Sequence, residues 1–65
     1  MTPEQKAAYI QAQAACALIE AMAMQALNMQ RDKQGYSMAY DDEAFFKLIE
    51  KYGISHNAVL TLINA

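Results

Sequence analysis

The chain has 65 residues, of which 55% are hydrophobic and 18% are charged, and its formal net charge is −2. This length allows one domain at most, over residues 1–65, and the hydrophobic fraction is too high for a disordered tail. A single cysteine and a single histidine exclude an internal disulfide framework and a metal site of clustered ligands, and the negative charge disfavours a broad phosphate-binding surface.

The first predicted element is a long helix over residues 3–31. Thr2 suits the N-cap, Pro3 suits the first helical position, and Gln5 completes a capping box with Thr2. Nothing in this stretch breaks a helix, and Gly35 is the first residue that would stop it. Such a helix is about 43 Å long, which is long for so small a protein.

Two shorter helices are predicted in the second half of the chain, over residues 42–52 and 56–64. Asp41 suits the N-cap of the first and Ser55 that of the second. Gly53 stands where a left-handed residue ends a helix. We therefore expect an all-α fold.

Each of the shorter helices has one apolar face that we expect to be buried. Ile54 is expected to close back on the preceding helix in a Schellman motif. The two faces consist of Phe45, Leu48, Ile49 and Tyr52, and of Val59, Leu62 and Ile63.

The long helix carries a seam of seven apolar residues at alternating spacings of four and three, the heptad pattern of helices that pack together. Four of the seven are alanine, which lets two helix axes approach closely. The seam consists of Ala8, Ala12, Ala15, Ile19, Met22, Ala26 and Met29.

The opposite side of the long helix is apolar too, so no wide polar face remains. Two short helices can cover only one of these sides. We therefore expect further copies of the chain, or another protein, to cover the other side, and one compact three-helix domain with an alanine-rich core is the alternative. The apolar residues opposite the seam are Ile10, Ala14, Ala17, Ala21, Met24 and Leu27.

Residues 45–62 resemble the helix-turn-helix of bacterial regulators, and the matching positions are Gly53, Ile54, Ser55, Val59 and Leu62. In that family the second helix lies in the major groove of DNA. The resemblance implies a dimeric regulator as the alternative function, with Ser55, His56, Asn57 and Thr61 reading the bases. The family usually has a small residue at the position of Ile49, and this second helix has neither Arg nor Lys. We therefore do not expect nucleic acid as the partner.

The sequence carries no pattern typical of catalysis. The acidic cluster Asp41, Asp42 and Glu43 is explained by helix capping, and no nucleophile stands at a helical spacing from His56. Cys16 lies among alanines like a small hydrophobic residue. We predict no enzymatic activity, no cofactor and no metal.

Aromatic and cationic side chains could line pockets between subunits and hold a small anionic, nucleotide-like ligand. The candidates for binding such a ligand or a partner protein are Tyr9, Arg31, Lys33, Tyr36, Tyr40, His56 and Asn57.

The chain is short, acidic, rich in alanine and predicted to self-associate. In these respects it resembles the accessory proteins of phages and prophages, which inhibit or sequester host factors. The resemblance is to a type of protein and implies a host protein or a small anionic ligand as the partner. Polar residues interrupt the apolar N-terminal half, so we expect neither a signal peptide nor contact with a membrane, and a cytoplasmic location.

Overall fold

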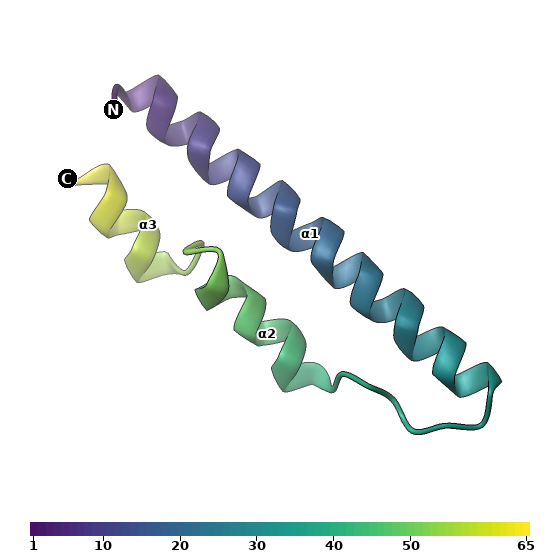
Figure 1. Ribbon diagram of the computed structural model, residues 1–65. Helices are drawn as coiled ribbons and strands as arrows, with labels where there is room; N and C mark the ends of the chain where they lie inside the picture. Colours follow the sequence, from purple (N-terminus) through teal and green to yellow (C-terminus); the bar gives the residue numbers. More distant parts are fainter.

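The computed structural model describes all 65 residues and contains three α-helices and no strand (Figure 1). The helices are α1 (Pro3–Lys33), α2 (Asp42–Lys51) and α3 (His56–Ile63). The predicted all-α fold is confirmed, and every predicted helix end lies within two residues of the observed one.

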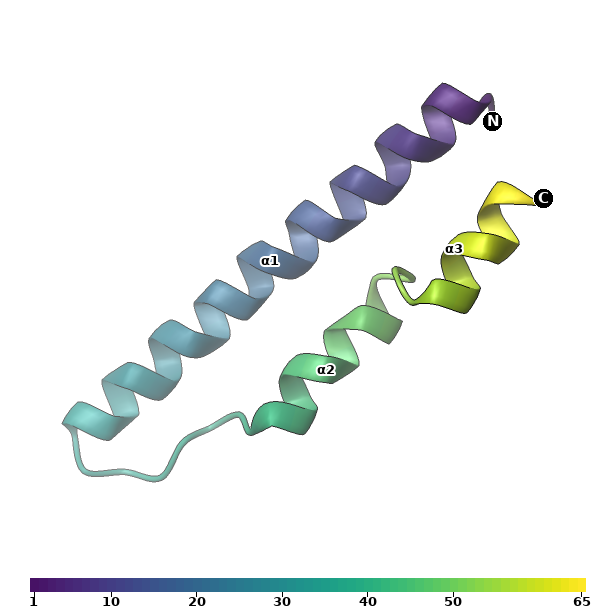
Figure 2. The same ribbon diagram turned by 180° about the vertical axis from the view of Figure 1, so that it is seen from behind.

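The helices form two layers, one made by α1 and the other by α2 and α3, which follow one another back along α1 (Figures 1 and 2). Both termini therefore lie at the same end of the molecule. Each short helix packs against α1, and the two do not pack against each other. The result is a thin plate of 49 × 17 × 10 Å, which differs from the compact three-helix domain that the sequence left open.

Local side-chain chemistry sets both ends of α1. The Gln5 amide donates to Thr2 Oγ1 at 3.1 Å and the Thr2 amide donates to Gln5 Oε1 at 3.0 Å, which confirms the capping box. At the other end Gly35 has φ +79°, and the Tyr36 amide donates to the Arg31 carbonyl at 2.9 Å. The left-handed glycine thus ends α1.

The joint between α2 and α3 is the predicted Schellman motif. Gly53 has φ +65°, and the Ile54 amide donates to the Ile49 carbonyl at 3.0 Å. The Ser55 hydroxyl then accepts a hydrogen bond from the Ala58 amide at 3.3 Å and caps α3. The C-terminal cap of α2 and the N-terminal cap of α3 therefore produce a bend between these helices, and both helices still pack against α1.

The core between the layers is thin. Only Ala17 and Met24 of α1 and Leu48 of α2 are buried. The predictions that Ile49 and Ile63 face the core are wrong, because their side chains are 41% and 53% exposed. Each follows a packed leucine, Leu48 or Leu62, by about 100° around its helix, so it lies at the edge of the contact with α1. Half-buried residues around the core are Ile10, Ala21, Phe45, Tyr52, Ile54, Val59 and Leu62.

Two side chains of α1 hold the loop of residues 34–41, namely Arg31, which donates to the Ser37 carbonyl, and Asn28, which makes three hydrogen bonds. Asn28 Nδ2 donates to the Tyr40 carbonyl at 2.7 Å, and its Oδ1 accepts from the amides of Ala39 and Tyr40 at 2.9 and 3.0 Å. Asp41 follows directly and caps α2 through a hydrogen bond from the Ala44 amide. Asn28 therefore fixes where the second layer begins.

We expect Asn28→Ala to lower the free energy of unfolding by about 1–3 kcal/mol, because it removes three hydrogen bonds at once. Urea denaturation measures this loss, and hydrogen exchange should show faster exchange at the amides of Ala39 and Tyr40. Asn57→Ala is the matched control, since Asn57 is exposed and its side chain makes no hydrogen bond. Equal effects of the two variants would contradict the role of Asn28.

Candidate functional site

The most distinctive surface of the molecule is the side of α1 that faces away from α2 and α3. All seven seam residues are exposed, and among them Ile19, Met22 and Met29 are between 57% and 68% exposed. Leu18 beside them is exposed as well. Each residue turns an α-helix by about 100°, so the seam lies about half a turn from the buried Ala17. We call the seam together with Leu18 the outer face.

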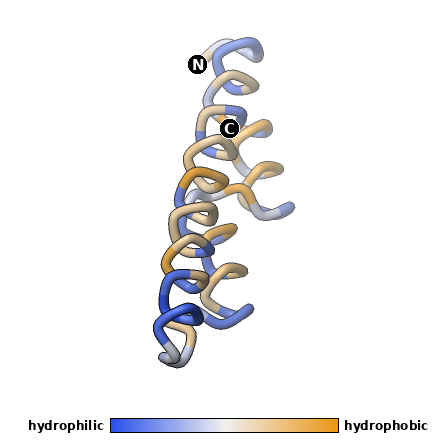
Figure 3. The backbone as a smooth tube through the Cα atoms, turned by 90° about the vertical axis from the view of Figure 1, so that its right-hand side faces the viewer, coloured by the Kyte–Doolittle hydropathy of each residue, from blue (hydrophilic) through white to orange (hydrophobic).

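The outer face carries no charge over most of its length. Between Lys6 and Arg31 the only charged residue is Glu20, and this side chain lies on the side toward the second layer, where its Oε1 meets Lys51 Nζ at 2.6 Å. Figure 3 shows apolar residues along the middle of α1 and hydrophilic residues where α1 runs into the loop. An uncharged apolar strip of this kind is typical of a contact with another protein surface.

Glu20 and Lys51 form the only ion pair of the chain and join α2 to α1. The hydrogen bond from Lys51 lowers the pKa of Glu20, and the same bond raises the pKa of Lys51. Burial, followed by the nearby Glu20 carboxylate, raises the pKa of Tyr52. Gln13 Nε2 also donates to the Tyr52 carbonyl at 3.2 Å, so polar contacts hold the joint of the second layer on α1.

This pair gives folding a pH dependence with a definite sign. Because the pKa of Glu20 is lowered in the folded state, its carboxylate stabilises the fold at pH values above the ordinary pKa of 4.5. This stabilisation is lost as the pH falls through the folded-state pKa. The raised pKa of Lys51 means that its contribution is lost only as the pH rises beyond 10.5. We expect Glu20→Gln to lower the melting temperature slightly at neutral pH and to flatten its dependence on pH in acid. Circular dichroism melts at several pH values measure both effects, and Glu50→Gln, which removes an unpaired carboxylate, should change neither.

The predicted binding residues do not form one site within a single chain. Arg31 lies over the Tyr36 ring, 5.6 Å from its centroid, and Arg31 Nε donates to the Ser37 carbonyl at 2.7 Å. Lys33 and Tyr40 lie at the same end of α1. Tyr9 lies about 33 Å away along α1.

His56 and Asn57 are exposed at the start of α3. The other predicted DNA-reading side chains are engaged within α3, since Ser55 caps it and Thr61 Oγ1 donates to the Asn57 carbonyl at 2.9 Å. The helices of a helix-turn-helix pack across each other at about 90–120°, whereas α2 and α3 follow one another along α1 (Figure 1).

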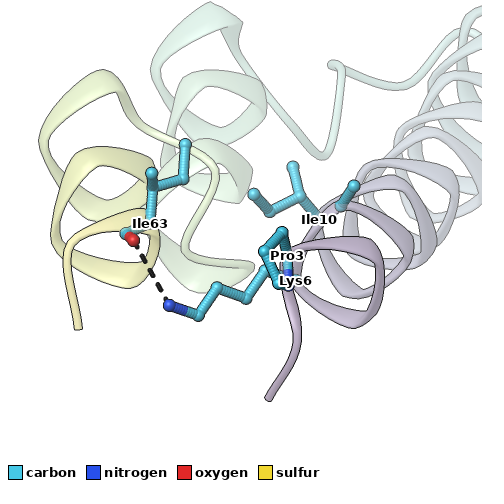
Figure 4. Close-up of a pocket in the computed structure, with 5 residues that line it drawn as sticks. Pro3, Lys6, Ile10 and Ile63 are labelled. Atoms are coloured by element: carbon cyan, nitrogen blue, oxygen red, sulfur yellow. Dashed lines mark hydrogen bonds between the residues drawn. The ribbon is translucent and has the colours of Figure 1, made fainter.

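A pocket of about 360 Å³ lies between the start of α1 and the end of α3 (Figure 4). Within it, Lys6 Nζ donates to the carbonyls of Ile63 and Ala65 at 3.2 and 2.9 Å. The positive charge thereby stabilises the negative end of the α3 dipole. Lys6 has a structural role here, and the pocket walls consist of Pro3, Lys6, Ala7, Ile10 and Ile63.

Three polar contacts between α1 and the rest of the chain were not predicted from the sequence. They are those of Lys6 with the end of α3, of Asn28 with the loop, and of Glu20 with Lys51. The ion pair of Glu20 could have been expected, because a lone charge in a long uncharged helix needs a partner of opposite charge if its side of the helix packs against another element. Asn28 continues the four-residue spacing of Glu20 and Met24, which marks it as a residue of the packed side.

By length and composition α1 is apolar enough to cross a membrane, a criterion that core helices of soluble proteins and signal sequences also meet. No group of three or more His, Cys, Asp or Glu side chains is placed to hold a metal ion. Comparison with family models, curated proteins and solved structures gave no significant match.

Proposed function

We propose that this protein is a non-enzymatic binding protein that works as a homo-oligomer assembled through the outer face of α1. The observation that carries this proposal is that all seven seam residues are exposed on the side that the second layer leaves open. A lone chain buries only three residues, which is a small core even for a domain of this size. Association of two outer faces adds Ile19, Met22 and Met29 to the buried apolar surface.

The assembly would inhibit or sequester a partner, either a host protein or a small anionic ligand, as phage accessory proteins do. Arg31, Lys33 and Tyr36 lie at one end of each copy, and symmetry repeats this group in an oligomer. Stacking on tyrosine together with positive charge suits a nucleotide-like anion. We propose a cytoplasmic location, in which the outer face meets another copy rather than lipid.

Two binding assays test this proposal against its rivals. Titration with double-stranded DNA at several salt concentrations should show no binding. Salt-dependent binding that Asn57→Ala or Thr61→Ala abolishes would favour the alternative function, a dimeric DNA-binding regulator. Flotation with phosphatidylglycerol vesicles should leave the protein at the bottom of the gradient. Flotation with the vesicles would assign the outer face to lipid and contradict the proposal.

A further inference from the structure

We infer that two copies pair through their outer faces with their α1 helices antiparallel, about a two-fold axis beside Leu18 and Ile19. This inference rests on the proposed function and adds the orientation and register of the pair. Two properties of the outer face carry it. They are the change in side-chain size along the seam and the charges at its two ends.

Side-chain size changes along the seam. The N-terminal half presents Ala8, Ala12 and Ala15, whereas the C-terminal half presents the exposed Ile19, Met22 and Met29, with Ala26 between them. Parallel helices in register would set alanine against alanine at one end and methionine against methionine at the other, which forces the axes apart along the pair. Antiparallel helices can instead set Ala8 and Ala15 against the larger Met29 and Met22 of the partner, with Leu18 and Ile19 meeting at the centre.

The charges lie at opposite ends of the outer face and have opposite signs. Lys33 comes four residues after Met29 and Glu4 comes four before Ala8, so both stand on the side of the seam. Both are exposed, and neither has an ion-pair partner within the chain. Antiparallel packing brings Glu4 near the partner's Lys33 at both ends of the pair, whereas parallel packing brings like charges together.

One register satisfies both properties. When Glu4 lies opposite the partner's Lys33, Ala8 lies opposite the partner's Met29, Ala15 opposite the partner's Met22, and Leu18 opposite the partner's Ile19. A hollow of about 290 Å³ on this face, lined by Ala26, Met29, Gln30 and Lys33, then lies under the start of the partner's α1. Exposed ion pairs add little affinity, so the end charges select the orientation while the apolar seam supplies the contact.

Disulfide cross-linking distinguishes the two orientations. In a Cys16→Ala background, Ala8→Cys mixed with Met29→Cys should give a cross-linked dimer of the two different chains under mild oxidation, and neither variant alone should cross-link. Phe46→Cys, on the far layer, controls for random collision. Cross-linking of Ala8→Cys with itself, or no cross-link in a mixture that is dimeric by mass, would overturn the antiparallel register. A monomeric mass of the Cys16→Ala parent would instead contradict the proposed function.

A charge reversal gives an independent test without oxidation. Lys33→Glu should weaken dimerisation about 2- to 10-fold at low salt, because it faces the partner's Glu4, and adding Glu4→Lys should restore it. In a parallel pair, residue 33 of one copy would face residue 33 of the other. Lys33→Glu would then only replace two facing positive charges by two facing negative charges. Unchanged dimerisation of Lys33→Glu in analytical ultracentrifugation would therefore overturn the antiparallel arrangement.

Discussion

Replacement of Ile19 by glutamate should convert the oligomer into a folded monomer. Ile19 is 68% exposed in the single chain, so a glutamate there is hydrated and disturbs no core. In the pair the residue lies beside the two-fold axis, where both copies would bury an unpaired carboxylate. We expect the mass of one chain in light scattering after gel filtration, with an unchanged helical circular dichroism spectrum. Ala15→Glu should act in the same way.

Phe46→Glu is the matched control for this result. Phe46 is 66% exposed, but it lies on α2 in the opposite layer, so its replacement should leave the parental mass unchanged. Retention of the parental mass by Ile19→Glu would show that the seam is not the interface. Dissociation by Phe46→Glu alone would place the interface on the second layer.

Replacement of Leu48 by alanine should have the largest effect on folding. Leu48 is only 8% exposed and is the single buried residue that α2 contributes to the core. Removing a buried leucine side chain costs about 2–5 kcal/mol, which is a large part of the stability of so small a domain. We expect a strongly lowered urea midpoint and detachment of the second layer from α1.

Leu60→Ala serves as the comparison for Leu48→Ala. Leu60 is 43% exposed on α3, and the same loss of side chain there should change the free energy of unfolding by less than about 1 kcal/mol. Equal losses at the two positions would contradict the packing of α2 on α1.

The helix ends could be predicted from the sequence because the interactions that set them are local. Thr2 and Ser55 each bond a backbone amide three residues further along the chain, and Gly53 allows the turn that ends α2. Such contacts form with the same partners wherever the helices lie in the fold. This is why each predicted helix end lies within two residues of the observed one.

The packing between the layers could not be predicted, because α1 is apolar on both sides and either side fits a core. The choice depends on contacts between distant residues, such as Asn28 with the loop, Lys6 with the end of α3, and Glu20 with α2. The heptad pattern predicted the members of the seam, but only the packed structure shows that the second layer leaves them uncovered. The orientation of the pair depends in turn on knowing that Glu4 and Lys33 flank that uncovered side.

Native mass spectrometry of the protein, purified gently from a bacterial host without added ligand, tests the central claim most directly. We predict an even number of chains, because a two-fold axis through the outer faces of α1 joins the copies in pairs. Any small molecule or protein retained in the complex would appear as added mass and identify the class of partner. A single chain at micromolar concentration would contradict the assembly and the function proposed from it.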